Sequence, residues 1–322
     1  MIYYDNLIKM KDIIGKTKKQ IKDLKIQGAT NIAKASILAV YNYAKKEKFK
    51  NSKDFYKKIS KAAKELAFTR PTEPLTQNAM RFLLSEIQDE RDLELAKSRL
   101  LNACNKMLEI LETAKEKIAK YTSNIIENGD KVFTHCHSST VEKGLILAKK
   151  KGKVFEVFNT ETRPLFQGRL TAKNLIKAGI PTTMVVDSSA CFLISRYSGK
   201  DLMMTKVLIG CDAILEDGSV INKIGSFGIS LSAHHEKIPL YVATSLLKFT
   251  PKSWIKIEKR SPKEVWRNAP KGLKIINFAF DIVPAKFIKG IICEKGLIKP
   301  IQIKKTIKEF YPWIFTNSHI LQ

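Results

Sequence analysis

The hydrophobic period of this chain changes at Asn128-Gly129-Asp130, and this change constrains the fold more than any other feature. Before this turn signal, apolar residues recur at helical spacing, most clearly over residues 93–121. After it, short apolar runs alternate with helical patterns. Strands and helices that alternate at this spacing are typical of βαβ units and a parallel sheet. The sequence therefore predicts two domains of different architecture.

We predict the α/β fold class, with an N-terminal helical domain over residues 1–125 and a Rossmann-like α/β domain over residues 126–322. Helical patterns in the first domain cover residues 31–43, 52–66 and 93–121, with another beginning near residue 76. The strand candidates of the second domain are residues 131–134, 154–159, 182–186, 206–209 and 240–243, and residues 275–281 resemble one more. The helical patterns between them are residues 139–150, 171–177, 191–197 and 222–234. Since no G-x-G-x-x-G follows the first strand, the sequence predicts no dinucleotide cofactor.

Composition narrows the class of protein. The chain of 322 residues has a formal net charge of +26, from 57 basic and 31 acidic residues, which favours anionic partners. The lysines are spread along the chain without a zinc finger or an RNA-binding motif, so we expect a solvated basic surface and no nucleic-acid partner. We also expect a soluble, cytoplasmic protein with no membrane partner, because neither a spanning segment nor a secretory signal is recognisable. Five cysteines without C-x-x-C spacing argue against a disulfide framework and against structural zinc.

Polar residues follow the predicted strands at their carboxyl ends, where ligands bind in open parallel sheets. These residues are Cys136, Glu161, Asp187, Asp212 and Ser245. Each has a purely structural alternative, since a lone buried cysteine is often inert and an aspartate after a strand is often a helix N-cap. The N-cap is our preferred interpretation of Asp187, and it stays open for Asp212.

Cys136 lies in a His-Cys-His triplet. Alternation along a strand would place the cysteine on one face and both histidines on the other, which argues against a metal site. Ser138, Ser139 and Thr140 follow at a predicted helix start. Their hydroxyls and the free amides of the first turn would form an anion site, and we expect such a site to lower the pKa of the thiol.

Further cations could complete an anion site. Lys223 follows Asn222 near a predicted helix start, where a bound anion would offset its unfavourable position on the helix dipole. Lys248 follows the last clear strand, although a surface position is an equal alternative for both lysines. Arg70 and Arg163 each precede a proline, which holds the backbone extended and suits bidentate phosphate contacts.

Five segments of the chain together resemble one superfamily in order and spacing. They are Thr134-His135-Cys136, Thr160-Glu161-Thr162-Arg163-Pro164 with Gln167-Gly168, Val185-Val186-Asp187-Ser188, Gly210-Cys211-Asp212-Ala213 and Asn222-Lys223-Ile224-Gly225. The superfamily joins archaeal ribose-1,5-bisphosphate isomerases, methylthioribose-1-phosphate isomerases and the alpha, beta and delta subunits of the eukaryotic initiation-factor-two-B exchange factor. The chain looks closest to the ribose-1,5-bisphosphate isomerase branch.

The resemblance implies an aldose–ketose isomerase that converts α-ribose-1,5-bisphosphate to ribulose-1,5-bisphosphate in nucleotide (AMP) salvage, without a cofactor or a metal. It implies that Cys136 is the proton acceptor and Asp212 the proton donor, and we expect Asp212 to be partly desolvated. A phosphorylated sugar would be the substrate, and the protein would be a homo-oligomer, either a dimer or a hexamer. The implied substrate contacts are Gln27, Gly28, Ala29, Thr30, Arg70, Ser138, Ser139, Thr140, Asn222, Lys223 and Lys248.

Two alternatives stay open. Gln27, His137 and Ser139 stand where the family usually has arginine, asparagine and lysine, so a non-catalytic subunit related to initiation factor 2B, binding sugar phosphate or nucleotide, is one alternative. A methylthioribose-1-phosphate isomerase is the other. That enzyme needs an apolar pocket for its methylthio group, whereas Arg70 and Lys248 suit a second phosphate better.

Overall fold

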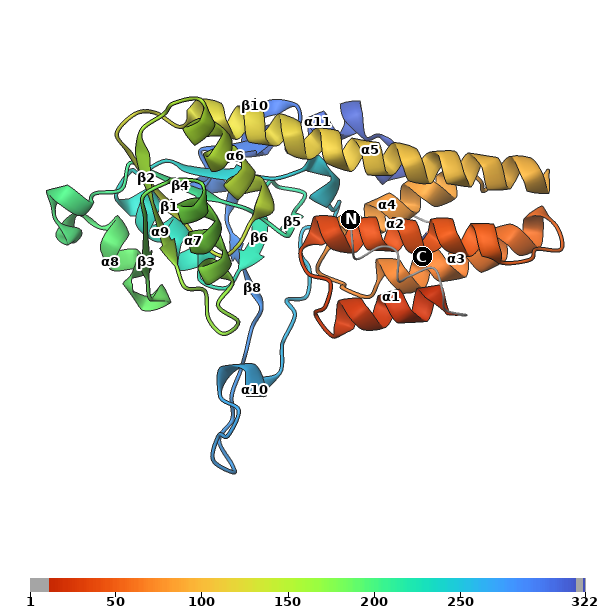
Figure 1. The fold of residues 1–322 in the computed structure, drawn as a ribbon, viewed down its shortest axis with the longest axis horizontal. Helices are drawn as coiled ribbons and strands as arrows, with labels where there is room; N and C mark the ends of the chain where they lie inside the picture. The colour runs from red at the N-terminus through yellow and green to blue at the C-terminus, as the bar shows by residue number, and fades with distance from the viewer. Residues whose placement is uncertain (1–11, 317–320, 322) are drawn as a thin grey trace. The chain divides into compact units, whose positions relative to one another are not determined.

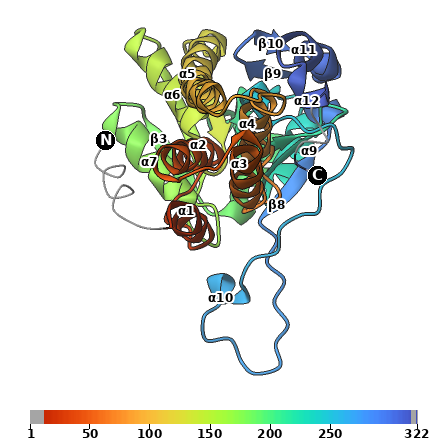
Figure 2. The ribbon, with the colours of Figure 1, turned by 90° about the vertical axis from the view of Figure 1, so that its right-hand side faces the viewer.

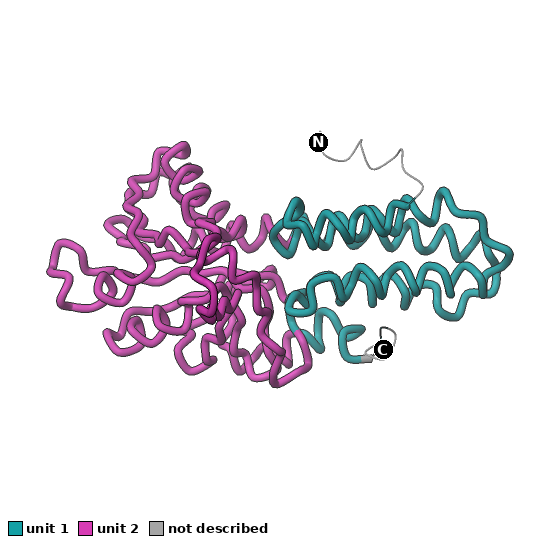
Figure 3. The backbone as a smooth tube through the Cα atoms, turned by 90° about the horizontal axis from the view of Figure 1, so that it is seen from below, with its two compact units in different colours: residues 1–113, 247–249, 307–322 teal, residues 114–246, 250–306 magenta. Residues whose placement is uncertain are grey.

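The computed structural model describes residues 12–316 and 321, which form two compact units. Of the described residues, unit 1 comprises 12–113, 247–249, 307–316 and 321, and unit 2 comprises 114–246 and 250–306, as coloured in Figure 3. The division falls inside the long helix α5 (Leu93–Ile125). The sequence predicts a domain boundary at the end of that helix, and this boundary stays a prediction. Among the residues that the structure describes, no helix has both the length and the apolar character needed to span a bilayer.

Unit 1 is helical, as the sequence predicts. Its helices besides the first part of α5 are α1 (Ile13–Lys22), α2 (Ala29–Lys46), α3 (Ser52–Ala67), α4 (Pro74–Ser85) and α12 (Trp313–Thr316). Helix α3 starts where the Asn51 side chain accepts the N–H of Asp54 at 2.9 Å. Helix α4 begins at Pro74, which lacks an N–H that the first turn does not need. Phe55 and Ile59 recur at helical spacing on α3 and are fully buried, so packing of this face holds the helix in its unit.

Unit 2 is built on a mostly parallel sheet of seven strands within the described residues, in the order β10-β9-β7-β4-β1-β2-β3. The strands are β1 (Asp130–Thr134), β2 (Phe155–Thr160), β3 (Thr182–Val185), β4 (Lys206–Ile209), β7 (Leu240–Ala243), β9 (Gly290–Cys293) and β10 (Gly296–Ile298). Only the β9–β10 pair is antiparallel among the described pairs of this sheet. The five strands predicted between residues 131 and 243 are confirmed, whereas β9 and β10 were not predicted.

A second, antiparallel sheet corrects two predictions. It consists of β5 (Ala213–Ile214), β6 (Val220–Lys223) and β8 (Phe280–Val283). The helix predicted over residues 222–234 is wrong at its start, because Asn222 and Lys223 pair in β6 with Asp281 and Phe280, and helix α9 covers Ser226–His235. The strand predicted over residues 275–281 begins later, at Phe280. In both places pairing with a distant strand overrides the local pattern.

The remaining helices belong to unit 2, apart from residues 307–310 of α11, which belong to unit 1. They are α6 (Ser139–Lys150), α7 (Gln167–Lys177), α8 (Ala190–Ile194), α10 (Pro262–Val265) and α11 (Ile303–Phe310). Leu145 of α6 and Leu175 of α7 pack with Val132 and Val157 of the sheet in one buried cluster. Ile255, Ile257 and Ala279 pack in the buried cluster of the small antiparallel sheet, and the chain between residues 257 and 279, which carries α10, extends as a long loop (Figures 1 and 2). The fold therefore leaves the carboxyl ends of β1 and β4 as the place where loops can assemble a site.

Candidate active site

The loops after β1 and β4 meet beyond the carboxyl ends of these two strands. The strands are parallel neighbours, with Phe133 opposite Val207, and they lead into Cys136 and Asp212. A Cβ atom on Gly210 would lie 2.6 Å from the Ser138 hydroxyl oxygen, so only glycine lets the two loops approach this closely. The structure thus brings together two loops whose polar residues the sequence singles out.

Cys136 has a left-handed backbone that its neighbours hold in place. Its φ angle is +68°, a conformation that a residue with a Cβ atom adopts rarely and at a cost of roughly 1–3 kcal/mol. The Cys136 N–H donates to the Thr162 hydroxyl at 3.0 Å, and the Cys136 carbonyl accepts from the Thr171 hydroxyl at 3.0 Å. Strand β1 ends at Thr134, so the alternation argument used for the His-Cys-His triplet was wrong in its premise. Two side chains, rather than the strand, set the direction of Cys136.

Asp187 fixes the loop that carries Thr162. Its carboxylate accepts the backbone N–H groups of Thr162 at 2.8 Å and Arg163 at 2.6 Å. Thr162 is itself left-handed, with a φ angle of +64°, and it is buried. The N-cap interpretation of Asp187 was wrong. The Asp187 carboxylate accepts hydrogen bonds from the loop after β2, and in the described chain it caps no helix. The sequence marked Thr160–Pro164 as a motif but gave no sign of this role for Thr162.

The two histidines of the triplet bond to different elements. His135 lies between the Thr160 hydroxyl, 2.6 Å from Nδ1, and the Ile224 carbonyl, 2.9 Å from Nε2. Burial lowers the pKa of His135, which favours the neutral ring. Burial also lowers the pKa of His137, against the opposing effect of the Glu142 carboxylate 3.5 Å away. No group of three metal-ligating side chains is found within the described part of the chain.

The electrostatic surroundings of Cys136 include Lys223, Asp212 and Asp187. Burial raises the pKa of the Cys136 thiol to about 11; the Lys223 ammonium opposes this effect, whereas the Asp212 and Asp187 carboxylates add to it. The expectation that a helix start lowers the pKa of this thiol was therefore wrong, because desolvation outweighs the favourable charges. The predicted acid and the predicted cation therefore both lie within electrostatic range of the predicted base.

The small antiparallel sheet positions the partners of Cys136. The Asp212 N–H donates to the Ile221 carbonyl at 2.8 Å, which ties the loop after β4 to β6. Asp212 is half-buried, as expected from its position. Asn222 is buried, and its side chain donates to the Ser226 hydroxyl at 2.8 Å. Lys223 is the last residue of β6, and its Nζ atom lies 5.1 Å from the centroid of the Phe280 ring.

The predicted anion residues at the start of α6 lie in the same loop as Cys136. The Ser138 side chain caps the helix by accepting the N–H of Val141 at 3.4 Å. Ser139 and Thr140 occupy the first turn and are half-buried. The helix amino end therefore directs backbone N–H groups toward the loop of Cys136, an arrangement that favours a phosphate.

The predicted contacts at Gln27, Gly28, Ala29 and Thr30 belong to unit 1, at the amino end of α2. Gly28 precedes the helix with a φ angle of +82°. The Gln27 side chain donates to the Leu24 carbonyl at 2.9 Å. Their role as substrate contacts stays a prediction.

Arg70 and Lys248 also belong to unit 1. The Arg70 guanidinium lies 3.3 Å from the carboxylate of Glu73, and both side chains are largely buried. The segment of Lys248 is held by Asn78, whose amide nitrogen lies 2.8 Å from the carbonyl oxygens of both residues that flank Lys248. The sequence did not identify Asn78, and the phosphate contacts of Arg70 and Lys248 stay predictions.

Known proteins resemble the chain over most of its length. A ribose 1,5-bisphosphate isomerase of Methanocaldococcus jannaschii is 37% identical over 309 residues, covering 94% of this chain and 97% of that protein. A methylthioribose-1-phosphate isomerase of Desulforamulus reducens is 32% identical over 302 residues, covering 88% of this chain and 86% of that protein. The two relatives are thus isomerases of different sugar phosphates.

A solved structure shares the fold. The translation initiation factor eIF-2B of Pyrococcus horikoshii superposes with a TM-score of 0.78 at 26% identity, covering 90% of this chain and 98% of that one. The sequence profile of the initiation factor 2 subunit family matches residues 25–300. On this match, and on the identity to its curated relatives, the chain belongs to the initiation factor 2 subunit family.

Proposed function

We propose that this protein is an aldose–ketose isomerase that converts α-ribose-1,5-bisphosphate to ribulose-1,5-bisphosphate. The isomerase class follows from its curated relatives, which are named isomerases. The observation that carries the proposal is the electrostatic effect of both Asp212 and Lys223 on Cys136, together with the pairing of β1 and β4, which brings the loops of Cys136 and Asp212 to the same end of the sheet. A base, an acid and a cation are the groups that a cofactor-free isomerisation of a sugar phosphate requires. The role in AMP salvage that the resemblance implies is part of the proposal.

The reaction moves one proton from C2 to C1 of the sugar. In the proposed sequence Asp212 in its carboxylic acid form protonates the ring oxygen as the bond of that oxygen to C1 breaks, and the Cys136 thiolate removes the C2 proton. The electron pair left at C2 forms a C1–C2 double bond. Cys136 then returns its proton to C1 while the C2 hydroxyl gives its proton to Asp212, which leaves a ketone at C2 and restores both groups. Every bond and proton is accounted for without a redox partner.

The thiol must ionise before it can act as the base. With a pKa of about 11, only about one thiol in 10⁴ is ionised at pH 7. Lys223 is the group that favours the thiolate, and its ammonium is also suited to a substrate phosphate. We therefore assign Lys223 two roles: its ammonium stabilises the Cys136 thiolate, and it binds a phosphate of the substrate. Asn222, Ser138, Ser139 and Thr140 complete the proposed substrate contacts of unit 2.

The test is direct conversion of the sugar phosphate by the full-length protein. Incubation with α-ribose-1,5-bisphosphate should yield ribulose-1,5-bisphosphate, detected by ³¹P and ¹³C NMR. Cys136→Ser should abolish turnover, whereas Cys191→Ser, a matched change at an exposed cysteine, should leave it intact. Asp212→Asn should also be inactive, and Asp201→Asn is its exposed control.

The alternatives give different results in the same assay. Conversion of methylthioribose-1-phosphate with no conversion of the bisphosphate would favour the activity named for the Desulforamulus reducens relative. Tight binding of the bisphosphate without product would instead favour a non-catalytic subunit. Full activity of the Cys136→Ser protein would refute the assignment of the base.

A further inference from the structure

A cavity lies at the amino ends of β7 and β9, the end of the large sheet opposite to Cys136 and Asp212. Its volume is about 900 Å³. Residues 237–239 and 288–289 line it just before β7 and β9 begin, whereas Cys136 and Asp212 follow the carboxyl ends of β1 and β4. Residues 299–301 follow the antiparallel β10 and reach the same end. Because β4, β7 and β9 are parallel neighbours, the cavity is separated from the candidate active site by the length of the strands.

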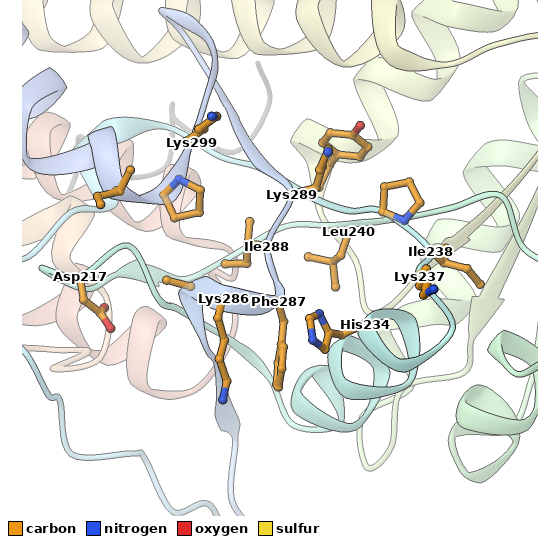
Figure 4. Close-up of a pocket in the computed structure, with 15 residues that line it drawn as sticks. Asp217, His234, Lys237, Ile238, Leu240, Lys286, Phe287, Ile288, Lys289 and Lys299 are labelled. Carbon is orange, nitrogen blue, oxygen red and sulfur yellow. The ribbon is translucent and has the colours of Figure 1, made fainter.

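Lysines dominate the charge of this cavity. They are Lys237, Lys286, Lys289 and Lys299 (Figure 4). The structure records no ion pair for these four among the residues it describes. The one acidic residue of the lining, Asp217, uses its carboxylate to accept the N–H and the hydroxyl of Ser219 at 2.9 and 2.8 Å. The lining therefore carries four lysines against one aspartate, so its net charge is positive and the Asp217 carboxylate offsets only part of it.

Apolar side chains and rings form the centre of the cavity. Figure 4 shows Leu240, Ile288 and Phe287 with the four lysines distributed around them. The Phe287 ring packs against the imidazole of His234, with centroids 4.8 Å apart and planes inclined by 39°. Leu240 and Ile288 are 1% and 6% exposed, so they form a buried apolar floor. An anion bound here would contact one or two lysines while the rest of the molecule covered apolar surface.

The walls of the cavity are fixed by backbone contacts. The Lys289 N–H donates to the Leu240 carbonyl at 2.8 Å, which joins the starts of β9 and β7. The Ala285 N–H donates to the Ser219 hydroxyl at 3.0 Å. A Cβ atom on Gly218 would lie 2.5 Å from the Pro300 carbonyl oxygen, so this turn packs directly on the opposite wall. A cavity with such walls needs little rearrangement to accept a ligand.

We propose that this cavity binds a small phosphate ester with a planar or apolar body, at a site separate from the candidate active site. Its volume lies within the range of about 300–1,000 Å³ found for small-molecule sites, which are mainly apolar with a few charged groups. Lysine ammonium groups bind phosphate as point charges, and the Phe287 and His234 rings offer a stacking surface. A neutral apolar ligand would leave the lysines without a counter-charge, and inorganic phosphate alone would leave the apolar floor exposed.

Three probes separate the contributions of charge and apolar surface. We would titrate the full-length protein with phenyl phosphate, inorganic phosphate and phenol by isothermal calorimetry. The proposal predicts that phenyl phosphate binds at least about tenfold more tightly than either of the others. Phenol binding as tightly as phenyl phosphate, or no saturable binding of phenyl phosphate below about 10 mM, would overturn it.

Variants assign the binding to this cavity, and they require no turnover. Lys289→Gln should weaken phenyl phosphate binding about tenfold, and Phe287→Leu should weaken it while leaving the affinity for inorganic phosphate unchanged. Lys305→Gln, at an exposed lysine of α11 outside the cavity, should have no effect. Lys223→Gln tests the candidate active site, and loss of binding in this variant with retention in Lys289→Gln would overturn the proposal. Since binding is the readout, its failure would leave the proposed isomerase activity untouched.

Discussion

The ionisation of Cys136 can be measured separately from turnover. Iodoacetamide reacts with the thiolate, so its rate of alkylation of Cys136 follows the ionised fraction. With the pKa raised to about 11 by burial, that fraction is about 10⁻⁴ at pH 7 and about 10⁻² at pH 9. The rate constant should therefore rise about tenfold for each pH unit over this range. Peptide-resolved mass spectrometry gives the rate for each cysteine, and the exposed Cys191 shows that the reagent is active.

Two substitutions should change this rate in opposite directions. The Lys223 ammonium lowers the pKa of Cys136, so Lys223→Gln should raise it and slow alkylation at a fixed pH. The Asp212 carboxylate raises the same pKa, so Asp212→Asn should lower it and accelerate alkylation. A change of one in the pKa corresponds to about 1.36 kcal/mol and alters the rate about tenfold while the thiol is mostly protonated. Both substitutions should reduce turnover. In Asp212→Asn, therefore, the alkylation rate of Cys136 should rise while turnover falls.

Two control substitutions test whether the effects on Cys136 are specific. Lys305→Gln and Asp201→Asn change exposed groups that the structure does not place near Cys136, and they should leave its alkylation rate unchanged. A rate independent of pH between 7 and 9 would contradict a thiol controlled by burial. If Lys223→Gln and Asp212→Asn shifted the rate in the same direction, the assigned electrostatic interactions would be wrong.

Three further predictions concern packing and position. Lys206→Met should lower the free energy of unfolding of unit 2 in urea by about 3–5 kcal/mol, because it leaves the buried carboxylate of Asp130, now 2.6 Å from the ammonium, without its partner. Gly210→Ala should lower kcat/KM at least about tenfold by pushing apart the two loops of the candidate active site, whereas Gly228→Ala, where a Cβ atom would make an ordinary 3.6 Å contact, should not. Asp187→Asn should lower kcat/KM about tenfold or more while it accelerates alkylation of Cys136, and slower alkylation or an unchanged kcat/KM would contradict its role as a positioning residue.

The local sequence was sufficient to predict helices and strands whose ends are marked by neighbouring residues. The helix predicted over residues 139–150 is α6 to the residue, because Ser138 supplies an N-cap that is visible in the sequence. Helix α7 begins four residues before its predicted start at residue 171, since Phe166 precedes it in a left-handed conformation without a capping side chain. The local sequence predicts that a helix starts at Asn222 and Lys223. The two residues instead form a strand, because they pair with residues of β8 that lie almost 60 positions away in the chain. No window of local sequence contains that information.

At the candidate site, too, some residues could be predicted from the local sequence and others could not. Cys136 and Asp212 could be identified because a polar residue directly after an apolar run is visible in sequence. The hydroxyl of Thr162 could not, because its contact with the Cys136 N–H depends on the fold of the loop after β2. The pKa of the thiol was predicted in the wrong direction for a related reason, since the segments that bury Cys136 come from distant parts of the chain. Sequence thus locates reactive groups better than it locates what tunes them.

Asp187 shows how position and charge compete at this site. Strand register brings it there, because Thr160 pairs with Val185 and Asp187 follows two residues later, beside the turn after β2. Its carboxylate then holds Thr162, which in turn receives the Cys136 N–H, but the same negative charge disfavours the thiolate. An amide at this position would remove the unfavourable charge, yet its NH₂ group could not accept the second backbone N–H. A carboxylate is therefore the side chain that satisfies both donors, and in the proposed mechanism the opposing charge of Lys223 favours the Cys136 thiolate.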